Sequence, residues 1–320
     1  METKTKVWLI IAVSLVLIGC YLFTGVMSKL NWDFTKLSTF KYETNVYEIS
    51  ESFEHISINT NTAEIIFTVS DSENLKVECY EAEMLKHSVT VEENTLVINT
   101  IDNRAWYDYI GISLGSPKIT ISLPTTEYRS LFINEHTGDI EIPDSFTFTD
   151  ADITASTGDV NFNTSASETV KIKTSTGDIH LENISAGTLD LSVYTGKVTV
   201  SGVTCEGDIT VNVSTGKASL TDIECKNIIS SGSTGDISLE NVIAKEKFSI
   251  KRSTGNIKLV RADAAEIFIK TDTGSVRGSI LTDKVFITQT DTGNISVPKT
   301  ANGGKCEVIT DTGDIKITIE

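Results

Sequence analysis

Two patterns of apolar residues divide the chain. From Val7 to Ser28 the sequence runs 22 residues without a charged side chain, which is the length that an α-helix needs to cross the hydrocarbon core of a membrane. Beyond residue 130, apolar residues instead alternate with polar ones, as they do in a strand with one buried face. The sequence therefore predicts one apolar helix followed by a β domain.

The alternation is tied to a repeated Thr-Gly pair that recurs every 19 or 20 residues. Its glycines are Gly138, Gly158, Gly177, Gly196, Gly216, Gly235, Gly255, Gly274, Gly293 and Gly313. In most repeats the second and fourth residues after the glycine are apolar, as are those seven and five residues before it. We therefore expect at least two strands per repeat. A third short inward edge is expected seven residues after the glycine, at Ile184, Val203, Ile223 and Val242.

A repeat of this size cannot bury its apolar residues alone, so repeats must stack. We predict an all-β fold, namely a single-stranded parallel β-solenoid with coils of about 19–20 residues, preceded by one N-terminal transmembrane helix. Glycine accepts positive φ at tight corners, and the Asp or Asn that follows can bond nearby backbone. A calcium ladder along the Asp column is the alternative, but Lys197 and Lys217 interrupt that column.

Changes in pattern divide the chain into five expected segments. These are a cytoplasmic tail (1–6), a signal-anchor helix (7–28), a juxtamembrane linker (29–50), an irregular β region that caps the solenoid (51–130) and regular Thr-Gly repeats (131–320). Within the cap, Thr62-Ala63-Glu64-Ile65 resembles a degenerate first corner with alanine in place of glycine.

The flanks of the apolar run indicate its orientation. Lys4 and Lys6 precede it and favour a cytoplasmic N-terminus, with the β domain outside the membrane. A lipoprotein is the alternative, because Leu17-Ile18-Gly19-Cys20 resembles a lipobox. Cleavage there would leave the apolar residues 21–27 without a membrane core to occupy, so we favour the helix. Both alternatives place the protein on the outer face of a membrane.

Composition narrows the classes of function. The chain has 44 acidic and 27 basic residues and a net charge of -17, which argues against nucleic acid as a partner. Its four histidines and five cysteines show no metal-ligand spacing, so we expect no metal, no cofactor and no catalytic residues. Cys205 and Cys225 each lie nine residues after a glycine. We expect them to be neighbouring buried thiols, with a disulfide as the alternative.

Aromatic residues break the repeat in the cap. Trp106, Tyr107 and Tyr109 interrupt the alternation of apolar and polar residues. We expect them to form a hydrophobic lid over the first coil, because solenoids need caps. The alternative is an interaction surface that stacks on sugars or on a protein partner.

The C-terminal strand is expected to leave an open sheet edge. Ile315, Ile317 and Ile319 form that strand, and no helix follows it in the sequence. An open edge can dock a partner or a second copy of the chain. The alternative is that the charges of Lys316 and Glu320 guard it.

Units of the form Ser-Thr-Gly-Asp-Ile-x-Leu, at Ser175–Leu181 and Ser233–Leu239, follow the hydrophobic anchor and the irregular β segment. Together they resemble a bacterial family of membrane-anchored β-strand-repeat domains of unknown function, often labelled "putative adhesin", with relatives in envelope-stress systems. The resemblance covers about residues 40–320, and this chain departs from the repeat at Lys197, Lys217 and Ser275. The family has no catalytic residues to carry over.

We therefore expect a non-enzymatic, adhesin-like protein of the cell envelope. Its partner would be an envelope protein or a polysaccharide of unknown identity. One alternative is an envelope-stress sensor or accessory regulator that acts through a membrane partner. A more remote alternative is a polysaccharide-acting β-helix enzyme.

Overall fold

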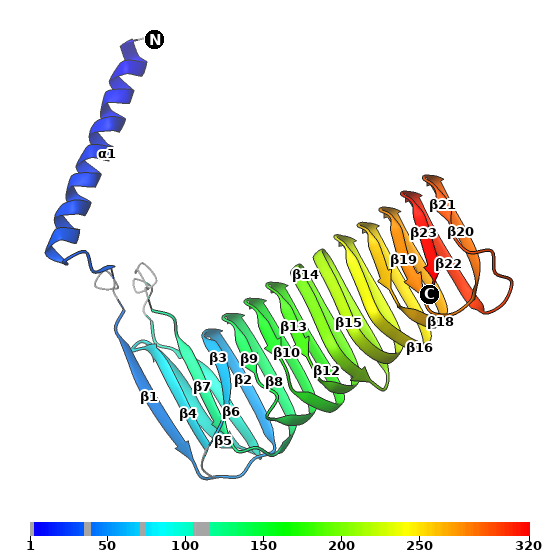
Figure 1. Ribbon diagram of the computed structural model, residues 1–320. Coiled ribbons are helices and arrows are strands. Elements are labelled where there is room, and N and C mark those ends of the chain that lie inside the picture. Colours follow the sequence, from blue (N-terminus) through cyan, green and yellow to red (C-terminus); the bar gives the residue numbers. More distant parts are fainter. Residues whose placement is uncertain (1–2, 35–39, 71–74, 105, 107–114) are drawn as a thin grey trace.

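The computed structural model describes residues 3–34, 40–70, 75–104, 106 and 115–320. One long helix, α1 (Thr3–Lys29), precedes the β domain and projects away from it (Figure 1). The segment Thr5–Lys29 is long and apolar enough to cross a membrane, a property that signal sequences share. Its most apolar part is not buried against the rest of the protein. The predicted apolar helix is thus confirmed as a helix.

Most of the chain winds into a β-solenoid. Its strands are β2 (His55–Thr62), β3 (Glu64–Val69), β8 (Glu127–Thr137), β9 (Ile140–Ile142), β10 (Thr147–Thr157), β11 (Val160–Phe162), β12 (Ser165–Thr176), β13 (Ile179–Glu182), β14 (Ser185–Cys205), β15 (Asp208–Thr234), β16 (Ile237–Thr254), β17 (Ile257–Val260), β18 (Asp263–Thr273), β19 (Val276–Ile280), β20 (Lys284–Thr292), β21 (Ile295–Ser296), β22 (Gly304–Thr312) and β23 (Ile315–Ile319). Most coils have a longer strand before the Thr-Gly pair and a shorter one after it. In the middle of the rod β14, β15 and β16 continue through corners.

Neighbouring coils pair in parallel and in register, so equivalent residues form columns. Ile153 pairs with Ile133 on one side and with Ile172 on the other. All three are completely buried, as the alternation of apolar residues requires. The residues seven after the glycines are also buried, and they are Ile184, Val203, Ile223 and Val242. The predicted solenoid and its third inward edge are confirmed.

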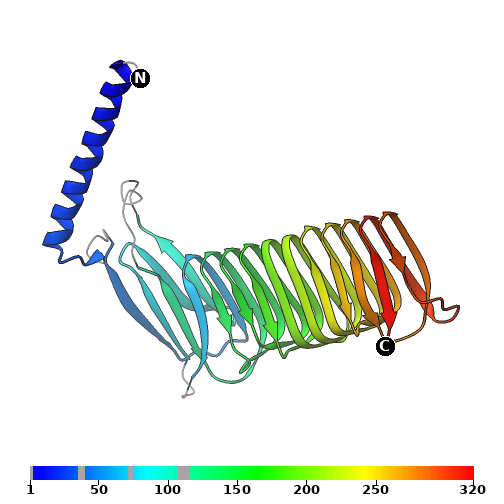
Figure 2. The same cartoon turned by 45° about the horizontal axis from the view of Figure 1, so that its top comes forward.

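The order of the coils in space departs from their order in the sequence at the C-terminal end. β22 pairs with β18 on one side and with β20 on the other. Likewise, β23 pairs with both β19 and β21. The last coil in the sequence is therefore inserted between two earlier ones, and β20 with β21 forms the outermost coil (Figure 2).

The prediction that the strand of Ile315, Ile317 and Ile319 forms the open end of the rod is therefore wrong. These residues lie in β23, which pairs with β19 along its whole length and with β21 at Ile315 and Lys316. Ile317 and Ile319 therefore have a paired strand on one side, but β23 is not the end of the rod. Equal spacing of the glycines sets the length of a coil, but it carries no information about which coil stacks on which.

A buried ion pair holds the segment that crosses over the inserted coil. Lys284 Nζ lies 2.7 Å from Asp263 Oδ1, and both side chains are almost fully buried. The same carboxylate accepts the backbone N–H of Ala264 at 2.8 Å and that of Leu281 at 3.1 Å. Asp263 thus fixes both ends of the connection between β19 and β20.

The other end of the rod is closed by strands that do not belong to regular repeats. They are β1 (Tyr42–Ile49), β4 (Leu75–Ala82), β5 (Leu85–Glu92), β6 (Thr95–Asp102) and β7 (Lys118–Leu123). β6 and β7 stack in parallel on β2 and β3. Beyond them, β5 pairs with β6, β4 with β7 and β1 with β4, all antiparallel. We call these five strands the cap.

Two expectations for this region are settled by the structure. Gly138 lies against the carbonyl of Ala63, so Ala63 does occupy a degenerate first corner. The linker predicted over residues 29–50 is too long, because residues 42–49 form β1. Alternating burial against β4 makes that segment a strand.

Candidate functional site

The Thr-Gly corners form one column along the rod. Nine of the ten predicted glycines have positive φ values between 126° and 156°. Gly216, for example, has a φ of 140°, and a Cβ at this position would overlap the carbonyl oxygen of Gly196 in the coil below. Only glycine permits this approach of two backbones, so the column is structural.

The residue after each corner glycine links consecutive coils. Oδ1 of Asp139 accepts the backbone N–H of Asp159 at 2.8 Å, and Oδ1 of Asp159 accepts that of Asp178 at 2.7 Å. At the interruptions, Lys197 pairs directly with Lys217 within continuous strands. The Asp column is therefore a ladder of hydrogen bonds to the backbone, as corner chemistry predicts.

A second corner column, which sequence analysis missed, lies six residues after the glycines. Its members adopt left-handed backbone conformations with φ between 51° and 63°, and they are Asn183, Gly202, Asp222, Asn241 and Arg261. Asn, Asp and Gly tolerate this conformation best. Their recurrence at a fixed offset was the signal available in the sequence.

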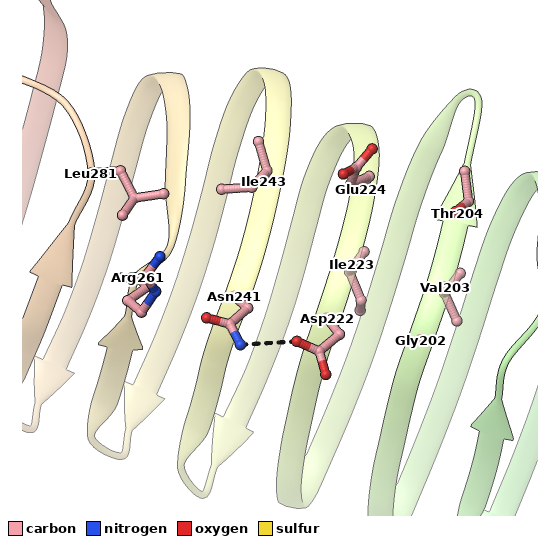
Figure 3. Close-up of a pocket in the computed structure, with 10 residues that line it drawn as sticks. All are labelled: Gly202, Val203, Thr204, Asp222, Ile223, Glu224, Asn241, Ile243, Arg261 and Leu281. Carbon is pink, nitrogen blue, oxygen red and sulfur yellow. Dashed lines mark hydrogen bonds between the residues drawn. The ribbon is translucent and has the colours of Figure 1, made fainter.

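This second column borders a shallow groove of about 680 Å³ (Figure 3). Asn241 Nδ2 donates a hydrogen bond to Asp222 Oδ1 at 2.9 Å, and Arg261 Nη1 lies 3.6 Å from Glu320 Oε2. Asp222, Asn241 and Arg261 thus contact other protein groups across or beside the groove. We interpret the groove as a consequence of the corner geometry.

Glu135 is an acidic residue inside the rod, three positions before the corner glycine Gly138. Its side chain is fully buried, and Oε1 accepts the backbone N–H groups of Ala63 at 3.3 Å and Thr137 at 3.0 Å. Burial raises the pKa of this carboxyl to about 7, although the backbone hydrogen bonds oppose the rise. Oε2 is buried without a hydrogen-bond partner.

The raised pKa of Glu135 predicts a pH dependence of stability. Between pH 4.5 and about 7 the folded state keeps the proton that the unfolded state releases, so stability falls as pH rises through this window. The loss in free energy of unfolding amounts to about 3 kcal/mol. We expect Glu135→Gln to remove this contribution, as measured by urea denaturation at pH 5 and pH 8. An unchanged difference between the two pH values in the variant would contradict the assignment.

Arg252 occupies the same column several coils away. It is buried, and its Nη2 donates to Ser230 Oγ at 3.1 Å. Burial lowers the pKa of the guanidinium to about 10. The side chain fills the space that Gly232 leaves empty, because a Cβ on Gly232 would overlap Arg252 Nη1.

The predicted aromatic surface is only partly within the described residues. Trp106 is 77% exposed, whereas Tyr107 and Tyr109 lie outside the described residues. The exposed indole of Trp106 is accessible to a partner, and its role in contact stays a prediction.

The stacked cysteines are buried free thiols, as expected. Sγ of Cys205 lies 3.4 Å from the carbonyl oxygen of Gly187. Burial raises the pKa of Cys225 to about 12, so this thiol stays protonated at neutral pH. Both residues are packing groups rather than nucleophiles.

The cap contains a buried cluster of chemically active side chains that sequence analysis missed. Cys79 and Glu81 lie on β4 and His87 on β5, and each residue is at most 3% exposed. One potential ligand atom from each of the three lies within 4.8 Å of the others. The signal was Cys-x-Glu on one strand and a histidine on the next, which is weak because the hairpin decides whether they meet.

Hydrogen bonds orient the carboxylate and the imidazole. Oε2 of Glu81 lies 2.7 Å from His87 Nδ1 and accepts the His87 backbone N–H, also at 2.7 Å. From β1, Asn45 Nδ2 donates to Glu81 Oε1 at 2.6 Å and Tyr47 donates its hydroxyl to the His87 carbonyl at 2.9 Å. His87 Nε2 is buried without a hydrogen-bond partner. Burial, reinforced by the Glu81 carboxylate, raises the pKa of Cys79 to about 12.

At the opposite end of the rod, the outermost coil exposes apolar side chains. Ile295 occupies an inward position but is 45% exposed, because no coil covers it. Ile287, on the outer face of β20, is 50% exposed. Among the described strands, β20 pairs only with β22 and β21 only with β23. We call β20 and β21 the tip.

Comparison with known proteins identifies the architecture. The model of the family described as toastrack DUF4097 matches residues 53–211 and 204–320. No curated protein matches the chain at a significant level.

Several solved structures are similar to this one. A "putative adhesin" from Bacteroides fragilis is 16% identical, with a TM-score of 0.42 over 87% of this chain and 97% of that one. A "putative lipid binding protein" from Parabacteroides distasonis is 16% identical, with a TM-score of 0.47 over 88% and 98%. A "putative adhesin" from Parabacteroides merdae is 12% identical, with a TM-score of 0.43 over 88% and 98%. At these levels the similarities carry no information about function.

Proposed function

This chain belongs to the toastrack DUF4097 family, and from that premise we propose that it is a non-enzymatic, adhesin-like interaction module on the outer face of a membrane. The observation that carries the proposal is the exposed tip, which lies at the end of the rod opposite the cap and α1 (Figure 1). The rod would hold the tip away from the membrane surface.

The exposed side chains of α1 support the membrane part of the proposal. Trp8, Leu15 and Leu22 are each more than half exposed, and apolar side chains in such a run are stable in hydrocarbon but not in water. Lys6 precedes the run and Lys29 ends it. We assign a single pass with the N-terminus in the cytoplasm and the β domain outside.

The tip supports a protein partner over a polysaccharide. Its strands have one side without a neighbouring strand, and a peptide can complete such an edge by adding a strand of its own. Ile295 together with the partly buried Phe286 and Val297 would supply apolar contacts. A sugar would leave the backbone groups of this edge only partly paired.

The proposal predicts cross-linking at the tip. A photoreactive amino acid in place of Ile287 is expected to give a protein adduct in intact cells. Adding Ile295→Lys should reduce the adduct by at least about tenfold, because a lysine charge would be buried in the contact. Immunoblotting and mass spectrometry of the adduct provide the measurement.

A matched control uses Ile229, an isoleucine in mid-rod with 39% exposure. The same photoreactive amino acid at this position is expected to give no adduct. Equal adducts at both positions would contradict a specific role of the tip. An adduct of two copies of this chain would identify the partner as a second copy.

A further inference from the structure

We propose that Cys79, Glu81 and His87 form a binding site for a divalent transition-metal ion, for which zinc is the best match. The site lies in the cap, at the other end of the rod from the tip, and it does not depend on the proposed interaction with a partner. It goes beyond our expectation from the sequence, in which no metal site was foreseen.

Cys79 and His87 supply donor atoms that zinc prefers, and Glu81 orients the imidazole. A thiolate sulfur, an imidazole nitrogen and a carboxylate oxygen are its usual protein ligands. Ligand atoms around a tetrahedral zinc ion lie about 3.3–3.8 Å apart, given zinc-to-ligand distances of about 2.0–2.3 Å. In the cap one potential ligand atom from each of the three residues lies within 4.8 Å of the others, so the side chains would have to move closer together when an ion binds.

The unpaired ring nitrogen of His87 is an independent sign of a ligand. A buried polar atom without a partner is unfavourable and calls for an explanation. Nδ1 of His87 is engaged by Glu81, which leaves Nε2 as the nitrogen available to an ion. Carboxylates that bond the second nitrogen of a metal-binding imidazole fix its tautomer and orientation. Glu81 is therefore placed to orient His87, while Nε2 of His87 and the thiol of Cys79 are the groups that would hold the ion.

Binding is a ligand exchange without redox chemistry. The S–H bond of Cys79 breaks and a sulfur–metal bond forms, while the proton leaves to water. The ion keeps its oxidation state, and its remaining positions are open to water molecules. Because a proton is released, affinity should increase with pH.

The position of the cluster indicates what the ion would do. β4 and β5 belong to different walls of the cap, since β4 pairs with β1 and β7 whereas β5 pairs with β6. Between themselves the two strands share only the pair Ala82–Leu85 at their turn. An ion held by Cys79 and His87 would link β4 to β5 beyond this turn and so hold the two walls of the cap together.

Cobalt(II) provides a direct spectroscopic test with the full-length chain in detergent. Reduced protein is expected to bind one Co²⁺ ion per chain, with a thiolate-to-cobalt charge-transfer band that Zn²⁺ displaces. Cys79→Ser should abolish the band, and His87→Gln should weaken binding by at least about tenfold. Cys306→Ser is the matched control, because Cys306 is also a fully buried free thiol and should leave the band unchanged.

Two results would overturn the proposal. One is the absence of a charge-transfer band in the reduced wild-type chain, and the other is a band that persists in Cys79→Ser. If the variants do not fold, the site is tested in the wild-type chain by alkylation of its cysteines. In mild denaturant, Zn²⁺ should slow alkylation of Cys79 but not of Cys306, as measured by peptide mass spectrometry. Equal alkylation rates with and without Zn²⁺ would also refute the site.

Discussion

Gly216→Ala is expected to lower the free energy of unfolding by about 3–5 kcal/mol. Gly216 has a φ of 140°, a conformation that alanine rarely adopts, and its missing side chain leaves room for the carbonyl of Gly196. An added methyl group must therefore strain the backbone and separate the two coils. The same glycine pairs in register with Gly196 inside continuous strands, so the distortion would interrupt the ladder in the middle of the rod.

Urea denaturation followed by circular dichroism measures this loss. The control is Lys217→Ala, which changes the adjacent exposed residue and is expected to alter stability by no more than about 0.5 kcal/mol. If both variants were equally stable, the corner would not depend on glycine, and the physical reason for the repeat would have to be revised.

Asp263→Ala is expected to cost about 3–5 kcal/mol, because it leaves the ammonium of Lys284 buried without its counter-charge. It also removes the acceptor for the backbone N–H groups of Ala264 and Leu281. The damage should be local to the tip, where the crossing segment starts. Hydrogen exchange of residues 284–296 is expected to accelerate strongly, while exchange in the middle coils changes little.

Two further variants separate burial from charge pairing. Asp272→Ala breaks an exposed pair, in which Lys270 Nζ lies 4.0 Å from Asp272 Oδ1, and should cost less than about 1 kcal/mol. Asp263→Leu combined with Lys284→Met should recover the part of the stability that the unpaired charge costs, since an apolar pair carries no desolvation penalty, but not the part due to the two backbone hydrogen bonds. If the double variant were as unstable as Asp263→Ala, the hydrogen bonds of Asp263 would outweigh the ion pair.

The regular part of the fold could be predicted because one physical requirement recurs in every repeat. Each corner needs a residue that accepts positive φ and close backbone contact, so glycine appears at a fixed interval. Each strand buries one face, so apolar residues such as Ile133 and Ile153 recur at fixed offsets from the glycine. Residue type and position therefore report the same geometry many times over.

The unpredicted features depend on relations between segments that no local pattern records. The spacing of the glycines does not record which coil lies next to β18, and the pair of Asp263 with Lys284 holds the connection only in the finished arrangement. The approach of His87 to Cys79 and Glu81 is decided by a hairpin whose strands diverge into two walls. Arg261 shows a third limit, because it adopts the left-handed corner conformation that its residue type does not favour.

The inserted C-terminal coil means that the rod cannot be completed in the order in which it is synthesised. Up to β19, each new coil can dock on strands that have already been made. The residues of β20 and β21 then emerge, but their partner strands β22 and β23 do not yet exist. The final coil must fill the gap before the tip can form. A chain interrupted during synthesis or export before residue 304 would thus lack the strands that hold β20 and β21 in place, and under the proposed function only finished molecules would engage a partner.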